Sequence, residues 1–430
     1  MSYYRIEGGK KLNGMISISG AKNAAVAIIP AVILCGCECT LLNVPDIEDV
    51  RILSKLLGHI GARVDFDAEK GIMRIDPSTI NSQDLSCDLM RSLRASYYFL
   101  GALYGRYGKA TIALPGGCVI GQRPIDIHME GLRELGALVA LRGDVLEAEQ
   151  KSVSYHDGEI RLPIRSVGAT INIMLAASAI KTGRTVITNP AKEPHIVDVA
   201  NFLNAMGADV RGAGTDRITI KPARSWHGCT YEIIPDQIET GTYMIAAAAA
   251  GGCVTLKNVI PRHMEALTQV LRDCGAKIEE KTDGERDYIT VTSDGRLKAT
   301  NIRTAPYPGF PTDLQQPMAA LLSIAEGTSM INETIFESRF LYAMQLELMG
   351  ADIKVSDDNK TAVIHGVKSL KGTDVNITDL RAGAALVVAA LTAKGESRVH
   401  KVKYLDRGYE GMDKKLRSLG AEIERVDDDR

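Results

Sequence analysis

The chain has 430 residues, 45% of them hydrophobic and 24% charged, and 51 Lys and Arg against 53 Asp and Glu give a net charge of −2. This composition is typical of a globular protein, and the length is sufficient for two or more domains. The nearly neutral charge and the 5% aromatic content argue against nucleic acid as a partner. No apolar run is long enough to span a membrane, and residues 1–14 lack the apolar core of a signal peptide, so we expect a cytoplasmic protein.

Residues 1–21 contain two short strand patterns, at Tyr4–Ile6 and Met15–Ile18. They precede the first repeated unit of the chain, which begins near Ser19. We therefore expect these N-terminal strands to pair with the last domain.

A Gly-Ala pair recurs six times, each time between an amphipathic helical pattern and a strand pattern. Glycine at this point suits the left-handed position that follows the end of a helix. The spacing is nearly constant, at about 70 residues, which indicates a repeated α/β module larger than an ordinary solenoid repeat. The six glycines are Gly61, Gly136, Gly207, Gly275, Gly350 and Gly420.

Each repeat contains the same parts in the same order. In the first repeat, an apolar helix is predicted over Ala24–Leu34, a strand over Cys39–Val44 and an amphipathic helix over Val50–His59. The first helix of each repeat is apolar on nearly all sides, as expected for a helix inside a core. The sequence therefore predicts two inside-out α/β barrel domains of three repeats each, with sheets outside the helices and a cleft between the domains. The expected domains are 22–233, and 1–21 together with 234–430.

Eight cysteines occur at irregular spacings, and we expect free thiols. Three form the run Cys35-x-Cys37-x-Cys39, but no second Cys or His pair lies at zinc-finger spacing. We interpret the run as small residues where an apolar helix turns into a strand. Residues 116–121 lack the Lys-Ser/Thr of a P-loop, and no dinucleotide fingerprint is present. We therefore expect neither a metal nor a cofactor.

The stretch 114–128 contains Cys118 next to a Gly-Gly pair, followed by Arg123 and by Pro124 at the predicted start of a helix. Free backbone N–H groups and a guanidinium at that point favour an anion. A thiol near them is expected to have a lowered pKa. Two interpretations remain open from these residues alone: a reactive thiol on a mobile lid, or a small buried Cys in a glycine-rich hairpin.

Several cations occur at equivalent points of the repeat, which suggests that they bind a polyanionic ligand together. They are Lys22, Arg94 and Arg381 near the core helices, and Arg123, Arg339 and Arg407 before the second helices. One carboxylate, Asp313, follows a Pro-rich segment at the start of the fifth core helix. It could cap that helix or serve as a general base, and the residues alone do not decide between these roles.

Long motifs in all six repeats make the chain resemble the enolpyruvyl transferase family. These motifs are Ser19-Gly-Ala-Lys22-Asn23-Ala, Leu93–Ser96, Leu114–His128, Ser166–Thr170, Ile238–Thr242, Phe310–Asp313, Asp379–Arg381 and Asp406–Tyr409. The resemblance implies transfer of the enolpyruvyl group of phosphoenolpyruvate to the 3′-hydroxyl of UDP-N-acetylglucosamine, with release of phosphate. These two small molecules are the expected partners, and the resemblance also implies a cytoplasmic monomer that serves cell-wall synthesis.

The resemblance further implies roles for individual residues. Cys118 would donate a proton to the methylene carbon and could form a covalent adduct with phosphoenolpyruvate, while Asp313 would accept the proton of the sugar hydroxyl. The anions would be bound by Lys22, Arg123 and Arg407, supported by Arg94, Arg339 and Arg381. The nucleotide sugar would contact Asn23, Arg123, Pro124, Ile125, Asp126, Ile127, Ser166, Val167, Asp313 and Ile335, and Asp379 is a further expected binding residue.

Two other functions fit parts of this pattern. The chain could act on shikimate 3-phosphate instead, although that reaction is not expected to need the thiol of Cys118. It could also be a nucleotide-sugar sensor without catalytic activity, although a sensor has no need of a thiol, a base and Lys22 together.

Overall fold

A computed structural model describes residues 2–114, 125–151, 157–180, 183–284, 286–295 and 297–427, apart from the side chains of Arg94 and Ala95. The described residues form two compact units. The first unit contains the described residues between Gly20 and Ile234, and the second contains residues 2–19 and 235–427.

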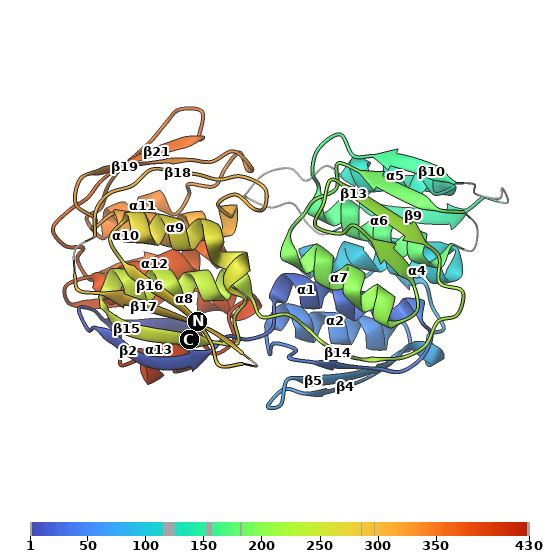
Figure 1. Cartoon of the computed structure of the whole chain (residues 1–430), viewed down its shortest axis with the longest axis horizontal. Helices are drawn as coiled ribbons and strands as arrows, with labels where there is room; N and C mark the ends of the chain where they lie inside the picture. The colour runs from blue at the N-terminus through green and yellow to red at the C-terminus, as the bar shows by residue number, and fades with distance from the viewer. Residues whose placement is uncertain are drawn as a thin grey trace. The chain divides into compact units, whose positions relative to one another are not determined.

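The first unit has three four-stranded sheets around a set of helices (Figure 1). The helices are α1 (Lys22–Ala31), α2 (Glu48–His59), α3 (Asp88–Ser92), α4 (Tyr98–Tyr107), α5 (Ile125–Glu134), α6 (Val167–Ala179) and α7 (Pro194–Ala205). One sheet has the strand order β14 (Thr230–Glu232), β3 (Cys39–Leu42), β5 (Ile72–Asp76) and β4 (Arg63–Asp67). The second has the order β6 (Asp84–Leu85), β7 (Lys109–Ala113), β9 (Val145–Gln150) and β8 (Ala137–Arg142). The third has the order β10 (Gly158–Arg161), β11 (Thr185–Thr188), β13 (Arg217–Lys221) and β12 (Asp209–Arg211).

The second unit repeats this plan. Its helices are α8 (Gln237–Ala250), α9 (Glu265–Asp273), α10 (Gln315–Leu322), α11 (Ala343–Leu348), α12 (Leu380–Thr392) and α13 (Met412–Ser418). One of its sheets has the strand order β16 (Lys277–Thr282), β17 (Asp287–Ser293), β15 (Gly252–Lys257) and β2 (Leu12–Ser17). The second has the order β18 (Ile302–Arg303), β19 (Thr328–Asn332), β21 (Thr361–His365) and β20 (Asp352–Val355). The third has the order β22 (Asp374–Asn376), β23 (Glu396–His400), β1 (Ser2–Glu7) and β24 (Glu422–Asp427).

The N-terminal strands complete sheets whose other strands come from the C-terminal half. β1 pairs antiparallel with both β23 and β24, and β2 pairs parallel with β15. The expectation that residues 1–21 pair with the last domain is thus confirmed for both strands. Similarly, the short strand β14, at the end of the first unit, returns to pair parallel with β3.

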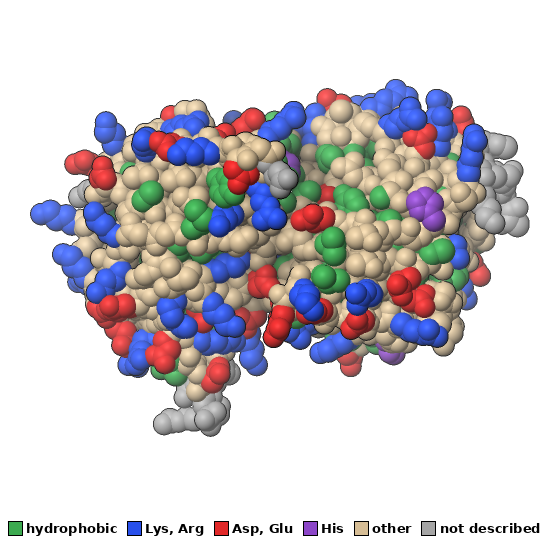
Figure 2. Space-filling view, turned by 60° about the horizontal axis from the view of Figure 1, so that its bottom comes forward, with side chains coloured by type: hydrophobic (Ala, Val, Ile, Leu, Met, Phe, Trp, Pro, Cys, Tyr) green, Lys and Arg blue, Asp and Glu red, His purple; other side chains and the backbone are tan. Residues whose placement is uncertain are grey.

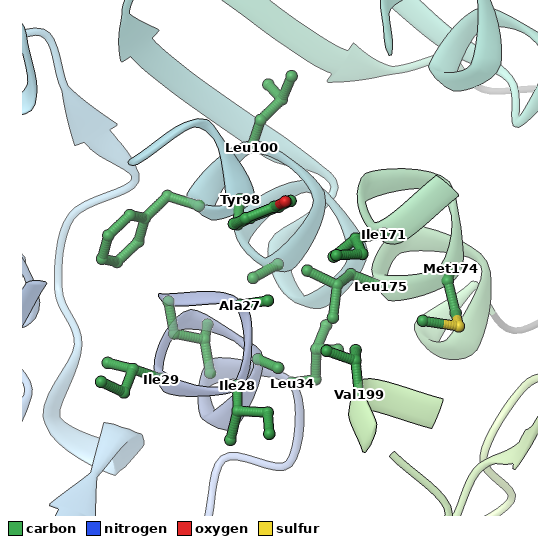
Figure 3. Close-up of a cluster of buried hydrophobic side chains, with 14 of the residues drawn as sticks. Ala27, Ile28, Ile29, Leu34, Tyr98, Leu100, Ile171, Met174, Leu175 and Val199 are labelled. Atoms are coloured by element: carbon green, nitrogen blue, oxygen red, sulfur yellow. The ribbon is translucent and has the colours of Figure 1, made fainter. Parts of the chain in front are cut away.

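The first helix of each repeat is buried, as its apolar sequence predicts. In α1 all residues from Ala24 to Ala31 are buried, and α6 is buried from Gly168 to Ser178. Figure 3 shows Ile28 and Leu34, at the centre of the first unit, close to Leu175 of α6 and Val199 of α7. The expected α/β fold of repeated units, with helices inside and sheets outside, is confirmed.

The six Gly-Ala pairs have the backbone conformation that the sequence predicts. All six glycines have positive φ, from 84° at Gly136 to 108° at Gly207. An L-residue with a side chain rarely adopts this conformation. The repeated glycine therefore ends each amphipathic helix and lets the next strand begin.

The surface carries charges of both signs. On the face drawn in Figure 2, Lys and Arg side chains are interspersed with Asp and Glu side chains, in agreement with the nearly balanced composition. Within the part of the chain that the structure describes, no helix is both long and apolar enough to cross a membrane.

Candidate active site

In the second unit, Asp313 lies between two arginines that are distant from it in sequence. Its Oδ1 accepts a hydrogen bond from Arg339 Nη2 at 2.6 Å, and its Oδ2 accepts one from Arg381 Nε at 3.1 Å. The side chains of Arg339 and Arg381 are only 4% and 6% exposed, whereas that of Asp313 is 27% exposed. The two buried guanidinium groups orient the carboxylate between them and favour its ionised form.

Local sequence places each member of this cluster. Asp313 lies in the single-turn 3-10 helix Thr312–Leu314, which leads directly into α10. The residues at the cap positions of these two helices, Pro311 and Leu314, form no side-chain capping hydrogen bond. The carboxylate of Asp313 instead accepts hydrogen bonds from guanidinium groups, so the structure favours a role in the charged cluster over helix capping.

The two arginines are further held by aromatic rings. The Arg339 guanidinium lies 4.9 Å from the centre of the Phe336 ring, and that of Arg381 lies 5.4 Å from the Tyr409 ring. Burial lowers the pKa of Arg381, but Asp313 and Tyr409 more than offset it, and the net shift is upward. The Arg381 guanidinium therefore remains charged, and the aromatic rings help to hold both guanidinium groups in fixed positions.

Asp379 caps a helix. Its Oδ1 accepts from the backbone N–H groups of Arg381 and Ala382, at 2.9 and 3.1 Å, and so begins α12. This cap fixes the first turn of α12, in which Arg381 lies.

Glu333 is a residue of this site that the sequence reasoning missed. Its carboxylate is buried and accepts hydrogen bonds from Thr304 Oγ1 and Thr312 Oγ1, both at 2.9 Å, and from the backbone N–H of Ile335 at 2.8 Å. It thereby connects the residue before Asp313 with the turn that carries Ile335 and Phe336. Nothing in the sequence near Glu333 indicates this role, because its partners come from separate segments.

Two further expected residues of the second unit lie nearer the surface. Ile335 is 38% exposed, which is unusual for a large apolar side chain and is compatible with a contact to a ligand. Arg407 ends the 3-10 helix Val402–Arg407 and is half-buried. The preceding residue, Asp406, accepts two hydrogen bonds from Arg425, at 2.7 and 2.8 Å, which fixes this segment.

In the first unit, Lys22 is the first residue of α1 and pairs with Asp49 in the first turn of α2. Lys22 Nζ lies 2.9 Å from Asp49 Oδ2, and the two side chains are 14% and 2% exposed. Asp49 is the second residue that sequence reasoning missed, and its position in the first turn of an amphipathic helix resembles an ordinary charge near a helix N-terminus. The pairing holds the Lys22 ammonium at the N-terminal end of α1.

Other expected residues of the first unit occur at helix starts. Ser166 caps α6, and its Oγ accepts from the backbone N–H of Ala169 at 3.3 Å. Val167 is the first residue of α6, and Asn23 follows Lys22 in α1; both are half-buried. At the start of α5, Ile125 is half-buried, Asp126 is exposed and Ile127 is buried.

Part of the expected site is not covered by the structure. Cys118, Arg123, Pro124 and nearly all of the expected lid 114–123 lie outside the described residues, as does the side chain of Arg94. Among the residues that are described, no group of three or more His, Cys, Asp or Glu is arranged to hold a metal ion.

Sequence comparison identifies the family. The family described as EPSP synthase (3-phosphoshikimate 1-carboxyvinyltransferase) matches residues 6–416. The UDP-N-acetylglucosamine 1-carboxyvinyltransferase of Clostridium botulinum is 50% identical over 99% of this chain and 100% of its own length. A protein of Clostridium acetobutylicum, UDP-N-acetylglucosamine 1-carboxyvinyltransferase 2, is 49% identical over 98% of each chain.

Solved structures have the same fold. The enolpyruvyl transferase NikO from Streptomyces tendae matches with a TM-score of 0.86 at 24% identity, over 99% of each chain. EPSP synthase from Acinetobacter baumannii matches with a TM-score of 0.75 at 17% identity, over 99% of this chain and 100% of its own. The chain belongs to the enolpyruvyl transferases, and within them to the family of UDP-N-acetylglucosamine 1-carboxyvinyltransferases.

Proposed function

We propose that this enzyme transfers the enolpyruvyl group of phosphoenolpyruvate to the 3′-hydroxyl of UDP-N-acetylglucosamine and releases phosphate, the first committed step of peptidoglycan synthesis. Identity near 50% over nearly the whole length to relatives with this name supports the choice of acceptor. The observation that carries the chemistry is the carboxylate of Asp313 held between the buried guanidinium groups of Arg339 and Arg381.

Asp313 accepts the proton of the sugar hydroxyl. Its carboxylate is more exposed than the two guanidinium groups, so it is the member of the cluster that a substrate can reach. Two nearby positive charges favour its ionised form, which is the form that can accept a proton. The hydroxyl oxygen then attacks the enol carbon that carries the phosphate group.

The substrate anions are bound by cations from several parts of the chain. Lys22, Arg123 and Arg407 hold the phosphate and carboxylate of phosphoenolpyruvate, and Arg94, Arg339 and Arg381 add to the positive field. Lys22 is supported by Asp49, and Arg381 by the cap from Asp379. Fixed positive groups of this kind stabilise the charge that develops on the departing phosphate.

Cys118 donates the proton that the methylene carbon requires, and it can form a covalent adduct with phosphoenolpyruvate. Protonation of this carbon leaves an oxocarbenium-like centre, which nearby anions stabilise. Closure of the segment 114–123 over both substrates excludes water from this step. These roles rest on the motif Leu114–His128.

The nucleotide sugar is bound by residues that the family motifs indicate. They are Asn23, Arg123, Pro124, Ile125, Asp126, Ile127, Ser166, Val167, Asp313 and Ile335. The enzyme acts as a cytoplasmic monomer that serves cell-wall formation, cell shape and cell division. Fosfomycin, an electrophilic phosphonate, alkylates Cys118 and thereby inactivates the enzyme.

The acceptor is tested by phosphate release from phosphoenolpyruvate. We expect saturable release with UDP-N-acetylglucosamine and none with shikimate 3-phosphate. Release only with shikimate 3-phosphate would assign the other reaction of the family. Binding of UDP-N-acetylglucosamine without release of phosphate would indicate a sensor.

A further inference from the structure

Four cysteines with no part in the proposed reaction lie close together in the first unit. Cys35 directly follows the 3-10 helix Val32–Leu34, at the end of the α1 segment opposite to Lys22. Cys39 begins β3, and Cys229 directly precedes β14. Cys37 is exposed and lies close to Gly228, the residue before Cys229, since a Cβ built on Gly228 would be 3.6 Å from the Cβ of Cys37. The cysteines before β3 and before β14 thus lie near the same end of one sheet.

The pairing of the strands places Cys39 and Cys229 side by side. β3 and β14 are parallel, with Thr40 opposite Thr230, and the Thr40 N–H donates to the Cys229 carbonyl at 2.9 Å. Each cysteine precedes one of these threonines, so both side chains are on the same face of the sheet. Neighbouring strands lie about 4.7–4.9 Å apart, and a disulfide needs Cα atoms about 4.4–6.8 Å apart. The spacing of these strands is therefore within the Cα range that a disulfide can span.

The two thiols differ in access and acidity. Cys229 is half-buried, and the hydrogen bond from Cys39 lowers the pKa of its thiol. Cys39 is buried, and its hydrogen bond to Cys229, together with burial, raises its pKa to about 12. Of these two thiols, Cys229 would therefore react first with a small oxidant, because the thiolate is the nucleophile.

A second possible partner for Cys39 is Cys35, whose Sγ lies 3.7 Å from Cys39 Sγ. Cys35 is also buried, and its hydrogen bond with Cys39, together with burial, raises its pKa. Neither member of this pair is both accessible and easily ionised. The pair with Cys229 is the one that an oxidant from solution can start.

We propose that Cys39 and Cys229 form a reversible disulfide when a hydroperoxide oxidises the protein. The Cys229 thiolate attacks one oxygen of hydrogen peroxide, the O–O bond breaks, and hydroxide leaves to form water with the proton that Cys229 released. The resulting sulfenic acid is attacked by the sulfur of Cys39, the S–O bond breaks, and a second water leaves with the proton of Cys39. Two thiols are oxidised by two electrons in total, and one peroxide is reduced to two waters.

The disulfide would fix the edge strand β14 to β3. β14 has three residues and lies directly before the point where the chain leaves the first unit. The new bond would close a long loop from Cys39 to Cys229, which reduces the entropy of the unfolded chain. We therefore expect a higher Tm for the oxidised protein than for the reduced protein, and a return to the lower value with dithiothreitol.

The test is peptide mapping of the full chain after treatment of the reduced protein with about one equivalent of hydrogen peroxide. Free thiols are blocked with N-ethylmaleimide before digestion. We expect one linked peptide pair that contains Cys39 and Cys229 and disappears after dithiothreitol. Cys229→Ser should abolish it, whereas Cys274→Ser, at a buried thiol of the second unit, should leave it unchanged.

Two results would overturn the proposal, and both come from the wild-type protein. One is recovery of both Cys39 and Cys229 as N-ethylmaleimide adducts after oxidation. The other is a disulfide between Cys39 and Cys35 in place of the expected pair. Because neither result depends on a variant, poor folding of Cys229→Ser would not obscure the outcome.

Discussion

Asp313 Oδ1 accepts a hydrogen bond from Arg339 Nη2 at 2.6 Å, although the two residues are 26 positions apart and in different segments of one repeat. The other oxygen accepts from Arg381, which is 68 positions away in the next repeat. The second unit thus uses two of its repeats to hold a single carboxylate. In the proposed reaction, this arrangement keeps the carboxylate ionised and oriented before substrate binds.

Asp313→Asn tests the role of this carboxylate as the base. The amide keeps the size of the side chain but cannot accept the proton, so we expect kcat to fall by about 10²–10⁴-fold. Steady-state kinetics measures the change, and circular dichroism checks the fold. Asp352→Asn is a suitable control, because Asp352 is exposed on β20 of the same unit. A kcat of Asp313→Asn within about threefold of wild type would exclude the role.

Glu333→Ala tests whether the buried acceptor holds the Asp313 segment in place. The change leaves the hydroxyls of Thr304 and Thr312 and a backbone N–H without their acceptor. We expect the free energy of unfolding to fall by about 2–4 kcal/mol and kcat/KM to fall with it. The control is Glu326→Ala, at an exposed residue, which should change neither quantity. Unchanged kinetics in a destabilised Glu333→Ala protein would show that Glu333 supports only the fold.

A pair of glycine substitutions tests the backbone of the repeat. Gly350 has φ of 91° and open space around a Cβ, so Gly350→Ala introduces backbone strain without a clash. We expect a loss of about 1–2 kcal/mol in the free energy of unfolding. Gly58 lies within α2, also with open space, and does not have positive φ, so Gly58→Ala should increase stability by about 0.5 kcal/mol. Equal effects of both changes would contradict the predicted left-handed position.

Asp198 gives a prediction about pH. Burial raises its pKa to about 6, although the Tyr231 hydroxyl donates to it at 2.6 Å. Between pH of about 4 and 6, Asp198 therefore stays protonated in the folded protein, whereas it is deprotonated in the unfolded chain. The contribution of Asp198 to the free energy of unfolding is fully present below pH of about 4 and is lost as the pH rises through about 6.

We expect the free energy of unfolding of wild type, relative to Asp198→Asn, to fall by about 3 kcal/mol from pH of about 4 to 7. Urea unfolding of both proteins across this range measures the difference, and the comparison cancels the contribution of the other titrating groups. A constant difference, or one that rises with pH, would contradict the shift assigned to Asp198.

Much of the fold was predictable because it depends on local patterns that recur. The all-apolar helices and the Gly-Ala pairs repeat in six places, so each copy supports the interpretation of the others. The positive φ of Gly61 and of its five equivalents follows directly from the end of a helix before a strand. The short edge strand β14 was harder to predict, since its three residues gain their conformation only from pairing with β3.

The candidate site was only partly predictable from the residues. Cations at equivalent points of the repeat indicated an anion site, but their partners come from separate segments and carry no local signal. The pairing of Lys22 with Asp49 and the contacts of Glu333 depend on how helices and turns pack. For Asp313 the sequence left two roles open, a helix cap and a general base. The contacts with Arg339 and Arg381 favour a role in the charged cluster over helix capping.

The most direct test of the proposed reaction is the identity of its products. The purified enzyme is incubated with phosphoenolpyruvate and UDP-N-acetylglucosamine, and mass spectrometry of the nucleotide sugar is combined with a phosphate assay. We predict that the nucleotide sugar gains the mass of one enolpyruvyl group, with one phosphate released for each product molecule. An unchanged nucleotide sugar, with or without phosphate release, would contradict the assigned reaction.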